Sequence, residues 1–215
     1  FSVAETLKEM IEKGRDTIWA FVLKNIYKPL FLVESFDLVV GNPPWLSYRY
    51  VERSEYQAFL RQQITSTYKL VERRPELVTH LELGTLFLVR SADLYLKAEG
   101  RIAFVLPKSI FSADQHDALR RGRFGEVLMS PSQLWDLEHV SPLFNISSAV
   151  YFGQKKWVPH MAKPIPGEVL SGHLPLRNAG LSAAESVLSC REAKFHFSTM
   201  GKRSFWTADR KVDLA

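Results

Sequence analysis

The stretch FDLVVGNPPWLSYRY, residues 36–50, places an Asn, two prolines and a Trp directly after a short apolar run. A nearly continuous apolar run of this length is typical of a strand buried on both faces of a parallel sheet. Asn42 is biased towards an extended backbone because a proline follows it, and Pro43 and Pro44 fix the chain after it. We therefore expect a rigid segment just beyond the carboxyl end of a parallel strand, where open α/β sheets bind ligands.

This rigid segment offers hydrogen-bond acceptors rather than donors. Neither proline has an N–H group, so the side-chain oxygen of Asn42 and the carbonyl of Pro43 are the acceptors held in place. Two fixed acceptors suit a group with two N–H donors, such as the exocyclic amine of a base or a side-chain amide. Trp45 adds a flat face, and stacking of a base on an aromatic side chain contributes about 1–3 kcal/mol. The segment is thus expected to hold a planar substrate that carries an amine.

The segments around the motif alternate between helix and strand, which is the pattern of an open α/β sheet. Apolar residues recur at helical spacing over residues 3–22, and residues 81–98 predict a second helix that ends at Gly100. Ser112 and Gln115 form a capping-box pattern at the start of a third helix. Further strands are expected at residues 101–106, 133–138 and 149–154, the last two as an antiparallel edge pair. The predicted fold is α/β, with an open, mostly parallel, Rossmann-like sheet.

The character of the sequence changes after Trp157. Prolines and glycines crowd residues 159–175, which is typical of a junction between two regions. Beyond it, residues 182–188 predict a short helix and residues 194–206 predict one strand. We therefore expect one unit over residues 1–157, followed by a linker and the start of a second region over residues 158–215.

Composition limits the classes of function that this chain can have but does not identify one. The net charge of +5 and the pI of about 9.3 favour an anionic partner. A single cysteine, Cys190, excludes an internal disulfide framework and fits a reducing, cytoplasmic compartment. The six histidines show no paired ligand spacing, so no metal site is expected. No apolar run approaches the roughly 20 residues of a membrane helix, so no membrane association is expected.

The run from Phe36 to Trp45 resembles the catalytic motif of N6-adenine DNA methyltransferases of the gamma class. That class includes the large methylases of restriction–modification and phage-defence systems. Residues 100–107 are similar to the next core strand of the family, and residues 140–154 are similar to its late motif. The resemblance implies that residues 1–157 are the C-terminal part of a catalytic domain and that residues 158–215 begin a DNA target-recognition region.

The resemblance also implies roles for individual residues. Asn42 and Pro43 would hold the amine of an adenine that is flipped out of double-stranded DNA, with Pro44 completing the motif. Trp45 and Phe144 would stack on that base, and the methyl donor would be S-adenosylmethionine. Nothing before Phe36 resembles the family's glycine-rich loop or the acidic residue that binds the cofactor, so we expect those residues upstream of Phe1.

Three alternatives remain open at this point. An amide also offers two N–H donors, and a related motif serves methyltransferases that modify a glutamine in release factors. An RNA methyltransferase is the second alternative, and a catalytically silent DNA-binding or assembly subunit is the third. Tyr48 and Arg49 follow the motif on a polar stretch, where a loop that contacts the base would lie, so we include them as candidate substrate contacts. Restriction or defence-system subunits are the other partners that the resemblance implies.

Overall fold

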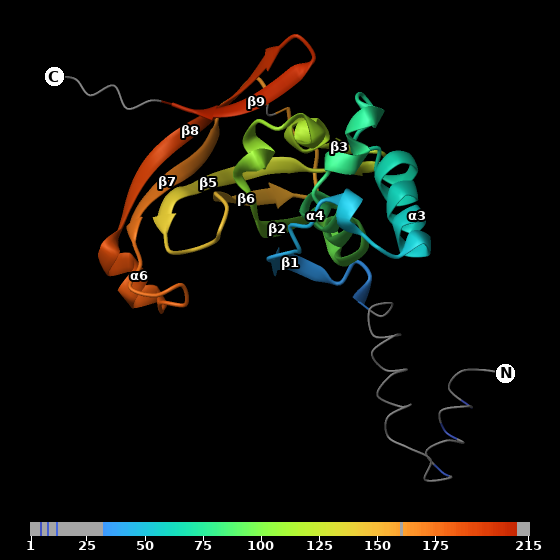
Figure 1. Ribbon diagram of the computed structural model, residues 1–215, viewed down its shortest axis with the longest axis horizontal. Helices are drawn as coiled ribbons and strands as arrows, with labels where there is room; N and C mark the ends of the chain where they lie inside the picture. Colours follow the sequence, from blue (N-terminus) through green and yellow to red (C-terminus); the bar gives the residue numbers. More distant parts are fainter. Residues whose placement is uncertain (1–4, 6–7, 9–11, 13–31, 160, 210–215) are drawn as a thin grey trace.

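The computed structural model describes residues 5, 8, 12, 32–159 and 161–209 of the 215-residue chain. A seven-stranded sheet runs through these residues (Figure 1). Its strands are β1 (Phe36–Gly41), β2 (Leu96–Pro107), β5 (Ser130–Ser141), β6 (Ser148–Gln154), β7 (Ile165–His173), β8 (Leu188–Met200) and β9 (Arg203–Ala208). A separate ribbon pairs β3 (Arg123–Phe124) with β4 (Val127–Leu128).

The helices of the described residues are α3 (Ser54–Gln62), α4 (Leu83–Tyr95), α5 (Asp117–Arg121) and α6 (Leu181–Val187). Short 3-10 turns occur at η2 (Tyr48–Tyr50), η4 (Pro75–His80), η5 (Lys108–Phe111) and η6 (Asp114–His116), and a π-helical turn, η3 (Gln63–Thr67), follows α3. The helix that the sequence predicts over residues 3–22 falls almost entirely outside the described residues.

Neighbouring strands follow the order β1-β2-β6-β5-β7-β8-β9. β1 pairs with β2, and β5 with β7, in parallel, whereas the other neighbours are antiparallel. The predicted α/β fold is confirmed, and so is the antiparallel pairing of β5 with β6. The described sheet is nevertheless mixed, and this pair lies inside it because β7 adds along the outer side of β5.

Strand β1 forms where the sequence predicts it but is not buried on both faces. Its side chains remain open to solvent, with Leu38 52% exposed and Val40 68% exposed. Within the described residues, β1 is the edge of the sheet and β2 is its one strand neighbour. The apolar pattern correctly predicts a strand, but no described segment covers these two side chains.

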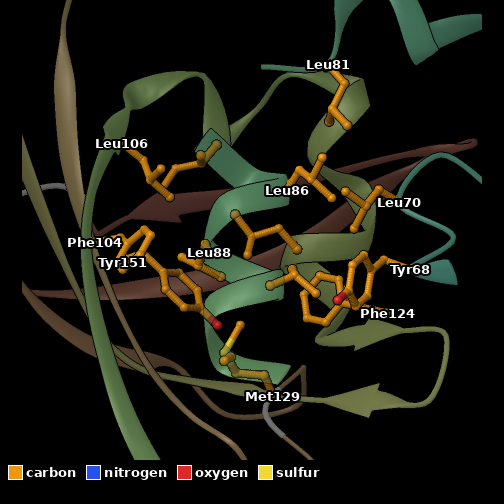
Figure 2. Close-up of a cluster of buried hydrophobic side chains, with 14 of the residues drawn as sticks. Tyr68, Leu70, Leu81, Leu86, Leu88, Phe104, Leu106, Phe124, Met129 and Tyr151 are labelled. Atoms are coloured by element: carbon orange, nitrogen blue, oxygen red, sulfur yellow. The ribbon is translucent and has the colours of Figure 1, made fainter. Parts of the chain in front are cut away.

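Helix α4 forms the centre of the core on one side of the sheet. Its buried face carries Leu86 and Leu88, which lie in one cluster with Phe104 of β2 and Tyr151 of β6 (Figure 2). The helix ends at Tyr95 rather than near Gly100, because the chain is already extended at Leu96 and β2 begins there.

The end of α4 is capped by a distant lysine instead of by a glycine. Lys155 donates from Nζ to the carbonyls of Asp93 and Leu96, at 3.0 and 2.8 Å. The left-handed backbone in this segment belongs to Glu99, with φ of 61°. A cation at the last carbonyls satisfies them and opposes the negative end of the helix dipole.

The expected capping box at Ser112 does not form. The chain instead makes the 3-10 turn η6 and then α5, and no side-chain hydrogen bond caps either element. Gln115 donates its amide to Glu82 instead, at 3.1 Å. A tertiary contact therefore replaces the local one that the pattern indicates.

The strands after residue 157 continue the same sheet and share the same core. Phe195 of β8 lies 5.3 Å from Phe111 between ring centroids, and Trp206 of β9 lies 6.1 Å from Tyr151. The expected helix in this region is α6, whereas the single strand expected over residues 194–206 is the hairpin of β8 and β9. The division into a catalytic domain and a recognition region at residue 157 stays a prediction.

A buried arginine joins α5 to β9. Arg120 has no exposed surface, and it donates to the carbonyls of Ile110 and Ala113, at 2.7 and 2.8 Å. Its Nε also donates to Ser204 at 2.9 Å, and Ser204 in turn donates to Asp117 at 2.6 Å. Burial lowers the pKa of Arg120 to about 10, so the group remains charged at neutral pH. The cation is thus compensated by carbonyl dipoles and, through a hydroxyl, by a carboxylate.

Candidate functional site

The motif Asn42 to Trp45 leaves the sheet at the carboxyl end of β1, as the sequence predicts. The side chains alternate along it: Asn42 and Pro44 are exposed, whereas Pro43 and Trp45 are half-buried. Pro43 and Trp45 therefore fix the segment to the body of the protein, while Asn42 remains available to a ligand.

Trp45 is tied to the second strand of the sheet. Its indole Nε1 donates to the carbonyl of Val105 on β2, at 3.2 Å. Because β1 and β2 are parallel, their carboxyl ends lie at the same edge of the sheet. The hydrogen bond holds the indole at that edge, beside the residue that begins the motif.

Trp45 and Phe144 lie against each other, although 99 positions separate them in the sequence. Their ring centroids are 4.6 Å apart with 52° between the ring planes, and Phe144 is 37% exposed. A planar ring cannot lie between two rings that already touch. A base held on both faces would require Trp45 and Phe144 to separate, whereas a base stacked on the exposed side of one ring would not.

The loop that carries Phe144 is held from two sides. The backbone N–H of Lys108 donates to the Ser147 carbonyl at 2.8 Å, and Lys108 Nζ pairs with Asp136 and Glu138 of β5, at 2.7 and 2.5 Å. On the other side, Arg177 donates to the side chain of Asn145 at 2.7 Å. The sequence alone did not single out Lys108 or Arg177, since neither lies in a motif.

The two other residues predicted to contact substrate, Tyr48 and Arg49, lie in different surroundings. Tyr48 belongs to the core, is 5% exposed and donates its hydroxyl to the Gln57 carbonyl at 3.1 Å. Arg49 is exposed and its guanidinium lies 4.8 Å from the centre of the Tyr50 ring. Tyr48 has a packing role in this fold, and contact of either residue with substrate stays a prediction.

Backbone pairing fixes the loop after Trp45. Leu83 donates to the Leu46 carbonyl at 2.8 Å, and Tyr48 donates to the Leu81 carbonyl at 2.9 Å. These bonds form an isolated antiparallel bridge between Ser47 and Glu82. The residue that starts α4 is therefore locked to the segment that follows the motif.

A buried polar network lies behind that bridge. The Glu82 carboxylate is 2.7 Å from His116 Nε2 and accepts a hydrogen bond from Ser109 at 3.1 Å, in addition to the one from Gln115. Thr85 Oγ1 lies 2.9 Å from Nδ1 of the same imidazole. Burial on its own would raise the pKa of Glu82, but its hydrogen bonds and the charge of His116 outweigh burial and lower that pKa to about 2. The carboxylate is thus ionised at neutral pH and joins α4 to the turns after β2.

Gly84 lets the first turn of α4 pack directly behind the two prolines. A Cβ at this position would lie 3.0 Å from Leu106 Cδ2, 3.5 Å from Pro43 Cγ and 3.7 Å from the Pro44 carbonyl oxygen. A side chain here has no room unless Leu106 or the motif moves.

We predict that Gly84→Val displaces Pro43 and lowers the rate of the reaction that the motif carries out by about tenfold or more, since misplacement by about 1 Å can cost about 10²-fold. The matched control is Gly180→Val, because a Cβ at Gly180 meets nothing within 4 Å. The measurement is the single-turnover rate of that reaction in the intact protein, at a temperature where both variants are folded. Equal rates in the two variants would show that the turn behind the prolines does not position them.

A cleft of about 370 Å³ borders the motif. Its lining includes Pro44 and Leu46 from the motif loop, Phe87 from α4, and Tyr50 and Tyr56. Aromatic and aliphatic walls of this kind fit a planar heterocycle such as the adenine ring of a cofactor. Among the described residues, no group of three or more His, Cys, Asp or Glu side chains could hold a metal ion.

The sequence of the chain matches the model of the Eco57I restriction-modification methylase family over residues 3–137. The match covers more than half of the chain and includes the motif, α4 and the turns after β2. The chain belongs to this family. The motif, the bridge at Glu82 and the first turn of α4 at Gly84 all lie inside the matched range. No curated protein sequence matches the chain.

Solved structures of restriction–modification proteins are also similar to the chain. They include the ATP-dependent Type ISP enzyme LlaBIII bound to DNA (12% identity, TM-score 0.40, covering 82% of this chain and 13% of that one). A DrdV–DNA complex matches with 15% identity and a TM-score of 0.47, covering 89% of this chain and 20% of that one. A modification subunit of a putative type I restriction enzyme from Vibrio vulnificus YJ016 matches with 13% identity and a TM-score of 0.41, covering 81% and 38%. The chain thus spans well under half of the length of these proteins.

No helix among the described residues is both long and apolar enough to cross a membrane.

Proposed function

We propose that this chain carries the base-binding side of a DNA methyltransferase site, which transfers a methyl group from S-adenosylmethionine to N6 of an adenine flipped out of double-stranded DNA. The observation that supports this most is the contact of Trp45 with Phe144 beside the exposed Asn42. The chain would act as part of a restriction–modification or phage-defence protein in the cytoplasm, where further subunits are possible partners.

The chemical contribution of the motif is to orient an amine. The nitrogen of an aromatic amine is a poor nucleophile because its lone pair is delocalised into the ring. Hydrogen bonds from both amine hydrogens to the Asn42 side-chain oxygen and the Pro43 carbonyl would favour a pyramidal nitrogen. Its lone pair would then be directed at the methyl group that the cofactor supplies. Most of the acceleration would come from this positioning.

The cleft at Pro44 is our candidate for part of the cofactor site. Trp45 and Phe144 do not line it, although Pro44 and Leu46 on either side of Trp45 do, and its apolar walls fit an adenine ring. S-adenosylmethionine supplies an electrophilic methyl group on a sulfonium.

The experiment that tests this function follows tritiated methyl groups into four substrates. These are duplex DNA, the same duplex with the target adenine mismatched, RNA of the same sequence, and a protein that contains glutamine. Label at N6 of adenine in DNA supports the proposal. The assay uses the intact protein that contains this chain. Label confined to RNA or protein supports the corresponding alternative, and no label in any substrate from the intact protein supports a silent subunit.

A second prediction concerns the free energy needed to flip the base out of the duplex. Trp45→Ala and Phe144→Ala should each slow methylation of duplex DNA by about 5- to 150-fold, since each removes an aromatic face that contributes about 1–3 kcal/mol. The defect should shrink on a mismatched adenine, because that base costs less to flip. Phe152→Ala serves as the control, since Phe152 packs on Trp135 within the sheet rather than on the motif. An equal defect on matched and mismatched DNA would exclude a role in flipping.

A further inference from the structure

A second cavity lies apart from the motif and from the cleft at Pro44, and it shares no lining residue with that cleft. It has a volume of about 210 Å³ and lies between the segment after η3 and helix α5. Its volume is below the usual range of sites for whole drug-sized ligands, about 300–1,000 Å³, and suits a small group. We call it the basic cavity because five cationic side chains line it: Lys69, Arg73, Arg74, Arg121 and Arg123.

The cations outnumber the carboxylates around this cavity. Three acidic side chains line it, Glu72, Asp114 and Asp117, against the five cations. Asp117 is shared by Arg73 and Arg121, at 3.4 and 2.9 Å. Asp114 is likewise shared by Arg74 and by Arg203 of β9. Each of these two aspartates thus faces two guanidinium groups, which leaves an excess of positive charge at the cavity.

The guanidinium groups retain donors for a ligand. A guanidinium carries five N–H groups, and the ion pairs with Asp117 use one each from Arg73 and Arg121. Arg123 is held over the Trp157 ring, 5.0 Å from its centre, and Arg121 lies 5.6 Å from the centre of the Phe197 ring. Stacking on aromatic rings restrains these side chains while their N–H edges remain able to bind an anion.

The backbone at the rim of the cavity departs from regular geometry. The π-helical turn η3 leads into it, and π-helical turns occur frequently at functional sites. Lys69, which lines the cavity, has a left-handed backbone with φ of 48°, an uncommon conformation for a residue other than glycine. Gly125, with φ of 60°, packs so closely on the Thr67 carbonyl that no Cβ would fit. These constraints hold Lys69 and its neighbours in place at the rim.

We propose that the basic cavity binds a phosphate group, carried either by the DNA backbone or by a free phosphate compound such as pyrophosphate. A phosphate offers several acceptor oxygens and negative charge, which match the arginine N–H groups and the excess of cations. The inference concerns a site distinct from the motif, and it does not depend on the methyl transfer proposed above.

The test replaces Arg73 and Arg123 together by Gln in the whole chain, which removes two charges from the cavity. The matched control replaces Arg61 and Arg191 by Gln, since neither arginine lines the cavity. Two quantities are measured for each protein: pyrophosphate affinity by calorimetric titration, and the affinity for a short fluorescent DNA duplex between about 50 and 200 mM salt. Thermal unfolding confirms that both double variants are folded.

The expected result is a difference between the two double variants. If the ligand is the DNA backbone, the slope of log affinity against log salt should fall by about 0.9 for each phosphate that is no longer neutralised, and only in the cavity variant. If the ligand is a free phosphate compound, only the pyrophosphate affinity should fall, by about tenfold or more for two charge-assisted hydrogen bonds. Equal slopes and equal pyrophosphate affinities in the cavity and control variants would overturn the proposal. A difference in slope together with methyl label confined to RNA or protein in the four-substrate assay would contradict the proposed function and leave this site standing.

Discussion

Asn42→Ala should lower the rate of methyl transfer by about 10²–10³-fold, the reduction that follows removal of one preorganised polar group in other enzymes. Asn42 is exposed at the carboxyl end of β1, so the substitution leaves the prolines and the hydrogen bond from Trp45 in place. The Asn42 oxygen acts on the reacting nitrogen, so the affinity for the cofactor should change much less than the rate. The measurement is a single-turnover rate in the intact protein, together with titration of the cofactor.

Two further variants make this prediction specific. Asn42→Asp keeps a side-chain oxygen as acceptor, so it should lose less activity than Asn42→Ala. Asn178→Ala is the control, because Asn178 is also exposed but lies after β7, away from the motif. If Asn42→Ala methylated DNA at the unaltered rate, the proposed orientation of the amine would be wrong.

Arg120→Ala should destabilise the fold by about 3–5 kcal/mol, the range observed when one member of a buried, charged network is removed. The substitution leaves the carbonyls of Ile110 and Ala113 and the hydroxyl of Ser204 without their donor, and it creates a cavity. Equilibrium unfolding in urea measures the change.

A comparison of two further variants separates the polar effect from the packing effect. Arg120→Met fills much of the volume without donating hydrogen bonds, so it should be less destabilising than Arg120→Ala. Arg61→Ala removes an exposed arginine from α3 and should change stability by no more than about 0.5 kcal/mol. A change of similar size in Arg61→Ala and Arg120→Ala would contradict the structural role given to Arg120.

The sequence predicted the elements around the motif because their signals are local. The apolar run before Asn42 indicated β1, and the helical spacing after residue 81 indicated α4. The proximity of Trp45 and Phe144 was expected from family resemblance, and their ring contact is consistent with it. Their roles on a base stay predictions.

The features that the sequence did not predict depend on interactions between distant segments. The end of α4 is capped by Lys155, whose position far along the chain gives no signal near Gly100. The pattern at Ser112 failed because Gln115 bonds to Glu82 across 33 positions. The contact of Glu82 with His116 joins residues 34 positions apart and follows no helical or strand spacing, so the sequence pattern does not indicate it.

The pairing of β7 along β5 constrains how this protein could be re-engineered. A chimera in which the sequence after residue 157 is replaced would lose β7, the parallel neighbour of β5. The backbone groups of β5 that pair with β7 would then lack partners. It would also part Arg120 from Ser204 and Phe111 from Phe195. A grafting point after β9, beyond Ala208, would keep the sheet and its core whole. The crossover point that keeps the fold intact therefore lies after β9, well past the Pro-rich junction at residues 159–175.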